Sequence, residues 1–116
     1  MVQGEKSIFS KIIAHEISAK IIAETDDLIV IEDIAPKAEI HYLIIPKKEI
    51  RDVQSFHQGD FVLAGKMFEM AQQLSRTIPG AEQFRLVINS GEKVGQKVFH
   101  LHMHFLAGKM FFKDVV

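Results

Sequence analysis

Residues 100 to 106 read HLHMHFL, so that histidines and hydrophobic residues alternate one by one. Strict alternation is typical of a β-strand, whose successive side chains point to opposite faces of a sheet. We therefore expect a strand over residues 98 to 106 that presents three imidazoles about 6.6 Å apart on one face. Those imidazoles belong to His100, His102 and His104. The opposite, apolar face would pack in the core through Phe99, Leu101, Met103 and Phe105.

The remaining chain predicts four more strands and two helices. Runs of β-branched and aromatic residues indicate strands, whereas apolar residues spaced three and four apart indicate helices. The strands are expected at residues 21–22, 28–31, 38–46 and 84–90. A short helix is expected after a cap at Ser7, with Ile8, Ile12 and His15 on one face. A long helix is expected from Gln58 to Ile78, ended by Pro79-Gly80, and would bury Phe61, Ala64, Phe68, Ala71, Leu74 and Ile78.

This order of elements favours an α+β domain. The connections between strands are too short for repeated crossover helices, so we expect an antiparallel sheet with the helices packed on one side. A chain of 116 residues is long enough for one hydrophobic core and too short for two comfortable ones. We therefore expect a single domain over residues 1–116.

Composition excludes several classes of function. The formal net charge of −1 argues against a surface that binds a nucleic-acid polymer, although a pocket for one nucleotide needs only local donors. The chain has no cysteine, which excludes disulfides, thiolate catalysis and zinc–thiolate sites. No apolar run approaches the roughly 18 residues of a membrane span, and the N-terminus does not resemble a signal peptide. We expect a cytoplasmic protein that does not associate with membranes.

Three roles are open to the histidines. They could be buried and purely structural, or two of them could share a metal ion with His41 or a carboxylate as a third ligand. Alternatively, one imidazole could act as a covalent nucleophile while its neighbours set its tautomer. The preceding loop, NSGEKVGQK, favours catalysis, because glycine backbone amides and the Asn89 side chain suit an anionic phosphate better than a cation.

At this point the sequence resembles the histidine triad (HIT) family. HLHMHFL matches the signature His-φ-His-φ-His-φ-φ, where φ is hydrophobic, and DIAP, IPKK and GQ occur in the same order as in its Hint branch. The resemblance covers nearly the whole chain. It implies the HIT fold, with about five antiparallel strands and two helices per subunit and a sheet shared across a homodimer.

The resemblance also implies an activity, namely hydrolysis of purine nucleoside 5′-phosphoramidates such as AMP joined to an amine. His102 would be the nucleophile, His104 would contact the phosphate and assist the leaving group, and His100 and His41 would orient the ring of His102. A purine nucleotide of the AMP or GMP type is the implied ligand, and no metal or other cofactor is required. The alternatives are a dinucleoside polyphosphate hydrolase and a nucleotide-binding adaptor without turnover.

Further binding residues carry over from the resemblance. Asp33 would hydrogen-bond the ribose hydroxyls. The base would contact Ile34, Ile8, Phe9 and Ile12, and the phosphate would contact Asn89, Gly95, Gln96 and Lys97. Lys97 departs from better-known members, in which a serine is frequent, and the tail GKMFFKDVV lacks their tryptophan. The first departure bears on the rate and on the preference for a leaving group, and the second bears on the choice of substrate across the dimer.

Overall fold

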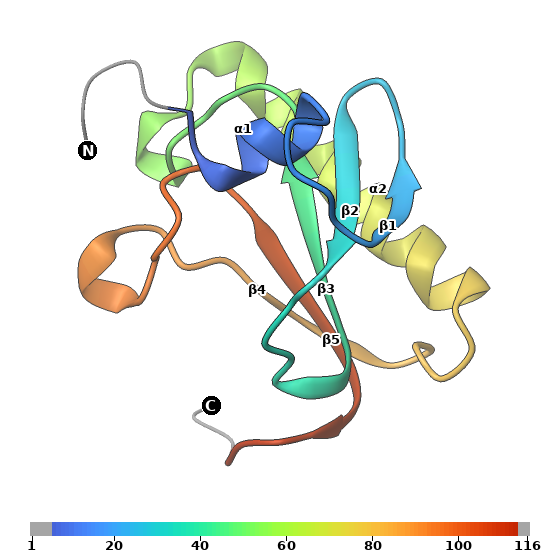
Figure 1. Cartoon of the computed structure of the whole chain (residues 1–116). Helices are drawn as coiled ribbons and strands as arrows, with labels where there is room; N and C mark the ends of the chain where they lie inside the picture. The colour runs from blue at the N-terminus through green and yellow to red at the C-terminus, as the bar shows by residue number, and fades with distance from the viewer. Residues whose placement is uncertain (1–5, 114–116) are drawn as a thin grey trace.

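The structure, a computed structural model, describes residues 6–113 and contains a five-stranded antiparallel sheet with two α-helices (Figure 1). The strand order is β1-β2-β3-β5-β4, so the last strand in the chain lies between β3 and β4. The strands are β1 (Ile21–Glu24), β2 (Leu28–Glu32), β3 (Ala38–Pro46), β4 (Phe84–Val87) and β5 (Met103–Met110). The helices are α1 (Ile8–Ile13) and α2 (Phe61–Thr77), with short 3-10 turns at Val53–Ser55, Gln58–Asp60 and Glu92–Val94.

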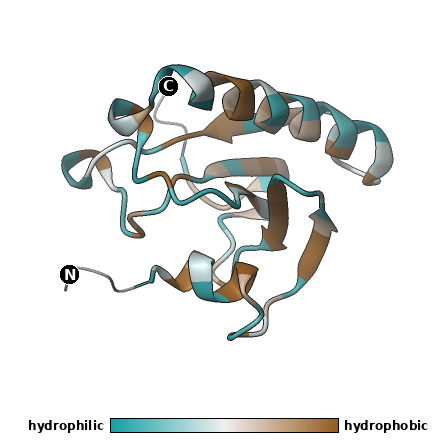
Figure 2. Cartoon of the chain, turned by 90° about the horizontal axis from the view of Figure 1, so that it is seen from above, coloured by the Kyte–Doolittle hydropathy of each residue, from teal (hydrophilic) through white to brown (hydrophobic). Residues whose placement is uncertain are grey.

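The two helices cover opposite faces of the sheet, so the prediction that both pack on one side is wrong. Alternate residues of β2 divide between two apolar clusters. Leu28 and Val30 pack with α2 in the larger cluster, whereas Ile29 and Ile31 pack with α1 in the smaller one. Figure 2 shows α2 lying across one side of the sheet and α1 below the other. Because both faces are covered, β2 is apolar along nearly its whole length and does not alternate with polar residues.

Strand β5 begins later than the alternation of histidines predicts. It starts at Met103, which pairs with Ile44, and the residues from 98 to 102 precede it. The ladder stops here because β3 ends at Pro46, whose ring nitrogen has no hydrogen to donate. The segment before β5 is held instead by single contacts, such as the hydrogen bond from the Leu101 N–H to the Ile50 carbonyl, 2.7 Å.

The alternation of faces nevertheless continues through this irregular segment. Leu101, Met103 and Phe105 lie in the cluster beneath α2, as predicted. Phe99 does not join them, because it lies half-buried under the Arg51 guanidinium, 4.2 Å from the ring centre. The expectation of a core position for Phe99 is therefore wrong.

Both helices are shorter than predicted. His15 lies beyond the end of α1 with a φ of 60°, so it does not extend the helical face. Residues 58–60 form a 3-10 turn before α2 begins at Phe61. The buried face of α2 consists of Met67, Met70, Ala71 and Leu74.

The predicted face of α2 is correct only in part. Ala71 and Leu74 belong to the buried face, but Phe61 and Phe68 are each 58% exposed. The helix carries two adjacent apolar stripes that share Ala71 and Leu74, and spacing alone does not show which of them faces the sheet. Among residues 6–113, no helix is both long and apolar enough to cross a membrane.

Candidate active site

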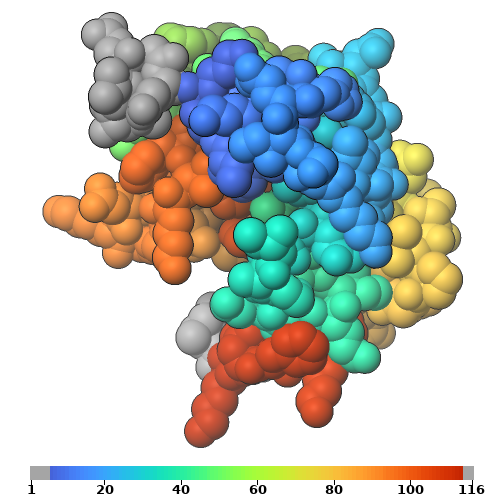
Figure 3. All heavy atoms as spheres, viewed as in Figure 1, coloured from blue at the N-terminus to red at the C-terminus, as the bar shows by residue number. Residues whose placement is uncertain are grey.

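A cavity of about 1180 Å³ lies on the α1 side of the sheet. Figure 3 shows this face hollowed between α1, the segment that follows β2 and the loop before β5. Its walls include most of the residues predicted for the site: Ile8, Phe9, Ile12, Asp33, Ile34, His41, Asn89, Gly95, Lys97, His102 and His104. The topology brings these residues together, because β3 and β5 are neighbours in the sheet although they are far apart in the sequence.

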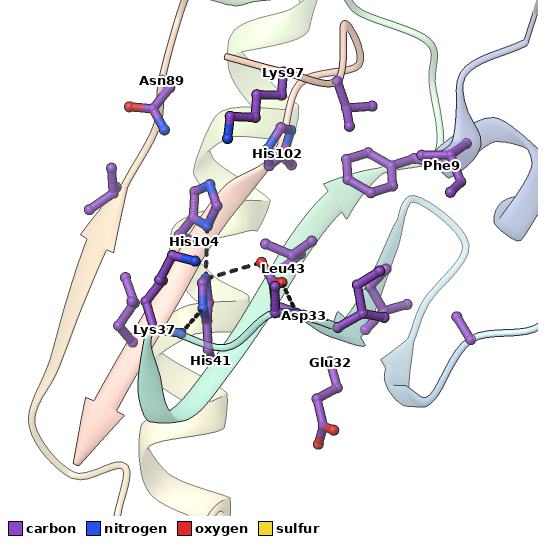
Figure 4. A pocket seen from close by; sticks show the side chains of 18 of the residues that line it. Phe9, Glu32, Asp33, Lys37, His41, Leu43, Asn89, Lys97, His102 and His104 are labelled. Atoms are coloured by element: carbon purple, nitrogen blue, oxygen red, sulfur yellow. Dashed lines mark hydrogen bonds and ion pairs between the residues drawn. The ribbon is translucent and has the colours of Figure 1, made fainter. Parts of the chain in front are cut away.

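His102 lies in the wall of the cavity immediately before β5 and is 9% exposed. Its Nδ1 is 2.8 Å from the backbone carbonyl of His100. A carbonyl can only accept, so Nδ1 must carry the proton, and Nε2 is left with a free lone pair. The ring of Phe9 packs edge-on against the imidazole at 5.0 Å between centres (Figure 4). The ring is thus held in one orientation and one tautomer.

His104 is the end of a hydrogen-bonded chain that begins at the backbone. The Lys37 N–H donates to Nδ1 of His41 at 2.9 Å, so the proton of the neutral His41 ring is on Nε2. His41 Nε2 in turn lies 2.9 Å from Nδ1 of His104, which must accept (Figure 4). This leaves the remaining proton of His104 on Nε2. Asp33 Oδ2, 3.4 Å from His41 Nε2, provides a further acceptor for the same N–H.

His100 supports the site from behind the wall and does not line the cavity. Its side chain is fully buried, with Nε2 2.8 Å from the Pro46 carbonyl and Nδ1 3.0 Å from the Ser7 hydroxyl. Nε2 therefore carries the proton, and Nδ1 accepts from the serine. This arrangement joins the start of α1 to the end of β3 and fixes the segment whose carbonyl orients His102.

Two other residues that were predicted to contact the nucleotide have unexpected positions. The Gln96 side chain is buried away from the cavity, where it accepts from the Gly91 N–H and donates to the Arg51 and Val98 carbonyls. It thus shapes the loop that carries Gly95 and Lys97, and its side chain does not line the cavity. Ile34 lines the mouth of the cavity but is 98% exposed.

Several lining residues were missed by sequence reasoning. Leu43 and Leu106 lie two positions after His41 and His104, on the same face of their strands. Strand alternation could therefore have identified both. The contributions of Lys37, Arg85 and Phe112 depend on the course of the loops and the tail, for which the sequence offers no comparable periodicity. Ser7 was predicted only as a helix cap, and it also contacts His100.

Burial keeps the site imidazoles uncharged. Removal from water lowers the pKa of His100, His102 and His41, in each case as the largest cause. The same cause, reinforced by the neighbouring His102, lowers the pKa of His104 to about 4. At neutral pH the cavity therefore contains a neutral imidazole with a free lone pair next to one with a free N–H. A group that can act as a nucleophile, His102, is therefore next to a group that can donate a proton, His104.

Asp33, His41 and His104 also have the composition of a metal site, with ligand atoms within 4.8 Å of one another. Their nitrogens are arranged for another purpose, because the proton between His41 and His104 occupies the space that a shared ion would need. A metal would have to displace that proton and break the chain from Lys37.

Comparison with known proteins identifies the family. The HIT domain matches residues 14–111, which is most of the chain. This chain belongs to the HIT family. Among curated HIT relatives, an uncharacterized HIT-like protein of Synechocystis sp. is 43% identical over 108 residues, covering 93% of this chain and 95% of that protein. One from Chlamydia trachomatis is 38% identical over 102 residues, covering 88% and 92%.

Solved HIT structures agree with the fold. A HIT family hydrolase from Clostridium thermocellum superimposes with a TM-score of 0.88 at 32% identity, covering the whole of both chains. A second, from Legionella pneumophila, gives 0.86 at 32% identity over 92% of this chain and 96% of that one. The predicted HIT fold, with five antiparallel strands and two helices, is confirmed.

The buried imidazoles of this HIT domain predict a loss of stability in mild acid. Each has a pKa below the value of about 6.5 that histidine has in an unfolded chain, so protonation favours unfolding. The free energy of unfolding should be greatest above about pH 6.5 and fall as the pH decreases, by up to about 1.4 kcal/mol per pH unit for each titrating histidine. Urea denaturation at about pH 7.5 and about pH 5 measures this difference, since carboxylates titrate mainly below that range.

The matched control replaces His104 with Asn, which removes one titrating group. The variant should lose less stability between the two pH values than the wild type. Equal midpoints for the wild type at both pH values would contradict the assignment of neutral, buried rings.

Proposed function

We propose that this HIT protein is a purine nucleoside 5′-phosphoramidate hydrolase of the Hint type. The observation that supports this most is the pair of ring nitrogens beside the cavity. His102 has a free lone pair on Nε2 because its Nδ1–H is engaged by a carbonyl, and His104 has a free N–H because its Nδ1 accepts from His41. The names of the Clostridium thermocellum and Legionella pneumophila structures, both HIT family hydrolases, support the same class of reaction.

In the first step, Nε2 of His102 attacks the α-phosphorus and forms a P–N bond. The bond between phosphorus and the amine breaks, and its electron pair goes to the departing nitrogen. That nitrogen also takes a proton from Nε2 of His104, because an amine leaves poorly as an anion. The His102 ring gains positive charge as it bonds to phosphorus, and this charge balances the negative charge that the neutral His104 ring acquires on giving up its proton, 5.1 Å away.

In the second step, water attacks the phosphorus of the nucleotidyl-histidine. One proton of the water returns to Nε2 of His104, and the water oxygen becomes a phosphate oxygen of the product nucleotide. The P–N bond to His102 breaks, and its electron pair returns to Nε2. Both imidazoles are thereby restored to their starting tautomers, and the reaction requires no metal.

The two ends of the cavity suit the two parts of a nucleotide. The apolar side chains of Phe9, Ile12 and Leu43 gather at one end and can cover a base. Asp33 lines the cavity beside His41, and its Oδ1 is already fixed by the Ala35 N–H at 2.8 Å. We infer that its other carboxylate oxygen accepts from the ribose hydroxyls.

We also propose that the protein is a homodimer. Strand β4 is an edge strand, paired only with β5 among the described residues. Its Phe84 and the following Ile88 are 39% and 36% exposed. Pairing of two β4 strands would cover these residues and extend the sheet across both subunits. The mass in solution, measured by light scattering, tests this.

Intact mass spectrometry after brief mixing with adenosine 5′-phosphoramidate tests the proposed function. We expect a transient mass increase of one adenylyl group, followed by release of AMP, with chelator present throughout. Binding of AMP without any product would contradict the hydrolase and leave a nucleotide-binding adaptor. Turnover of diadenosine polyphosphate in preference to the phosphoramidate would assign the chain to the alternative hydrolase class.

A further inference from the structure

The charged side chains around the cavity are unequally distributed. Four basic residues line it, Lys20, Lys37, Arg85 and Lys97, against two acidic ones, Glu32 and Asp33. Glu32 forms an ion pair with Lys20 at 3.3 Å, and Asp33 lies against His41. Lys37 and Lys97 make no ion pair with any residue from 6 to 113. Because the imidazoles are neutral, the cavity carries excess positive charge.

The two unpaired lysines lie at the end of the cavity away from the base pocket. Figure 4 shows Lys97 reaching past His102 toward Asn89, and Lys37 extending toward His104 from the opposite direction. Phe9 and Asp33 lie on the other side of the imidazoles (Figure 4). The ammonium of Lys37 is close enough to contribute to the lowered pKa of His41. A nucleotide whose base contacts Phe9 and whose phosphorus meets His102 would direct its leaving group between these lysines.

We propose that the site selects phosphoramidates whose amine carries a carboxylate, and that Lys37 and Lys97 bind this carboxylate. The inference rests on the proposed function and specifies its substrate class. One phosphate charge is already present at the reacting centre, and a second negative group at the leaving-group end would pair with the two exposed ammonium groups. A cationic amine would meet like charges there.

A phosphate leaving group is negatively charged, like an amine that carries a carboxylate, but its departure requires different chemistry. Phosphate departs as a stable anion, whereas an amine needs a proton. The chain from the Lys37 N–H through His41 leaves an N–H on His104 for that purpose. The donor chain therefore favours a carboxylate-bearing amine over a phosphate.

Four adenosine compounds provide the test. Three are 5′-phosphoramidates of similar length, made from β-alanine, β-alaninamide and 1,3-diaminopropane, which place a negative, neutral or positive group at the same end. The fourth is ADP, whose leaving group is phosphate. We expect kcat/KM for the β-alanine compound to exceed that for the amide about tenfold and that for the diamine by more, with the advantage shrinking at high salt.

Charge removal should abolish this selectivity. Lys97→Ser and Lys37→Ser should each reduce the ratio of β-alanine to amide turnover several-fold, and Lys97→Glu should favour the diamine. Lys93→Ser is the matched control, because Lys93 is exposed in the same loop as Lys97 but does not line the cavity. The ratio of β-alanine to amide turnover in Lys93→Ser should equal that of the wild type.

Binding of the same compounds to His102→Ala separates this inference from the proposed function. Tighter binding of the β-alanine compound to this variant, without any turnover of phosphoramidates by the wild type, would overturn the hydrolase and retain the charge selection. Equal affinities and equal rates for the three phosphoramidates would overturn the charge selection and leave the hydrolase in place. Faster turnover of ADP than of the β-alanine compound would overturn the assignment of an amine leaving group.

Discussion

Replacing His102 with Ala should lower kcat for an adenosine phosphoramidate by about 10⁴-fold or more, because the variant has no nucleophile in the cavity. Nucleotide affinity should change much less, since the apolar walls, Asp33 and the loop that carries Gly95 and Lys97 remain. Steady-state turnover and equilibrium binding of AMP measure the two effects separately. Intact mass spectrometry of the variant should show no adenylyl adduct.

Two controls test whether the loss of turnover comes specifically from the missing His102 imidazole. His15→Asn removes a histidine that lies outside the main cavity and should retain wild-type turnover. His102→Gly opens space for a free imidazole, and added imidazole should restore part of the activity. Retention of more than about a tenth of wild-type kcat by His102→Ala would show that another group is the nucleophile.

Replacing Phe105 with Ala should lower the free energy of unfolding by about 3–5 kcal/mol, a large part of the 5–15 kcal/mol typical of a domain. Phe105 is fully buried on β5, which lies between β3 and β4 in the sheet. Its ring stacks on Phe84 at 4.9 Å between centres and on Tyr42 at 6.3 Å, so its removal leaves a cavity at the middle of the sheet. Urea denaturation at neutral pH measures the change.

The matched control is Phe111→Ala, which removes the same side chain from a position that is 57% exposed. Its effect should remain within about 0.5 kcal/mol. A similarly small effect for Phe105→Ala would mean that the sheet closes the cavity by rearrangement, contrary to the tight packing of its core.

The sequence predicted the structure best where residue types are regularly spaced, as in the alternation of histidine and apolar residues. The alternation around His102 placed the imidazoles opposite Leu101, Met103 and Phe105 of the core. All five strands were located, although β5 starts at Met103 and not at residue 98. The resemblance supplied the residues of β3 and of the loops that line the cavity, and the spatial arrangement places nearly all of them there.

The errors arose where a property depends on distant residues. The start of β5 depends on Pro46, which has no amide hydrogen for the ladder, and no pattern near His100 reports this. Which of the two apolar stripes of α2 is buried depends on how the helix lies on the sheet. The side chain of Gln96 turns inward because the Arg51 and Val98 carbonyls need a donor, and only the folded loop creates that need.

The carbonyl that fixes the tautomer of His102 belongs to the backbone of His100, in a segment outside the strand ladder. Many catalytic histidines are oriented by an acidic side chain, which a single nucleotide change in the gene can remove. Here the acceptor is present whatever residue occupies position 100, so no replacement of one side chain deletes it directly. The orientation of the His102 ring is therefore protected against most point mutations, and it depends instead on the packing contacts that hold the segment in place.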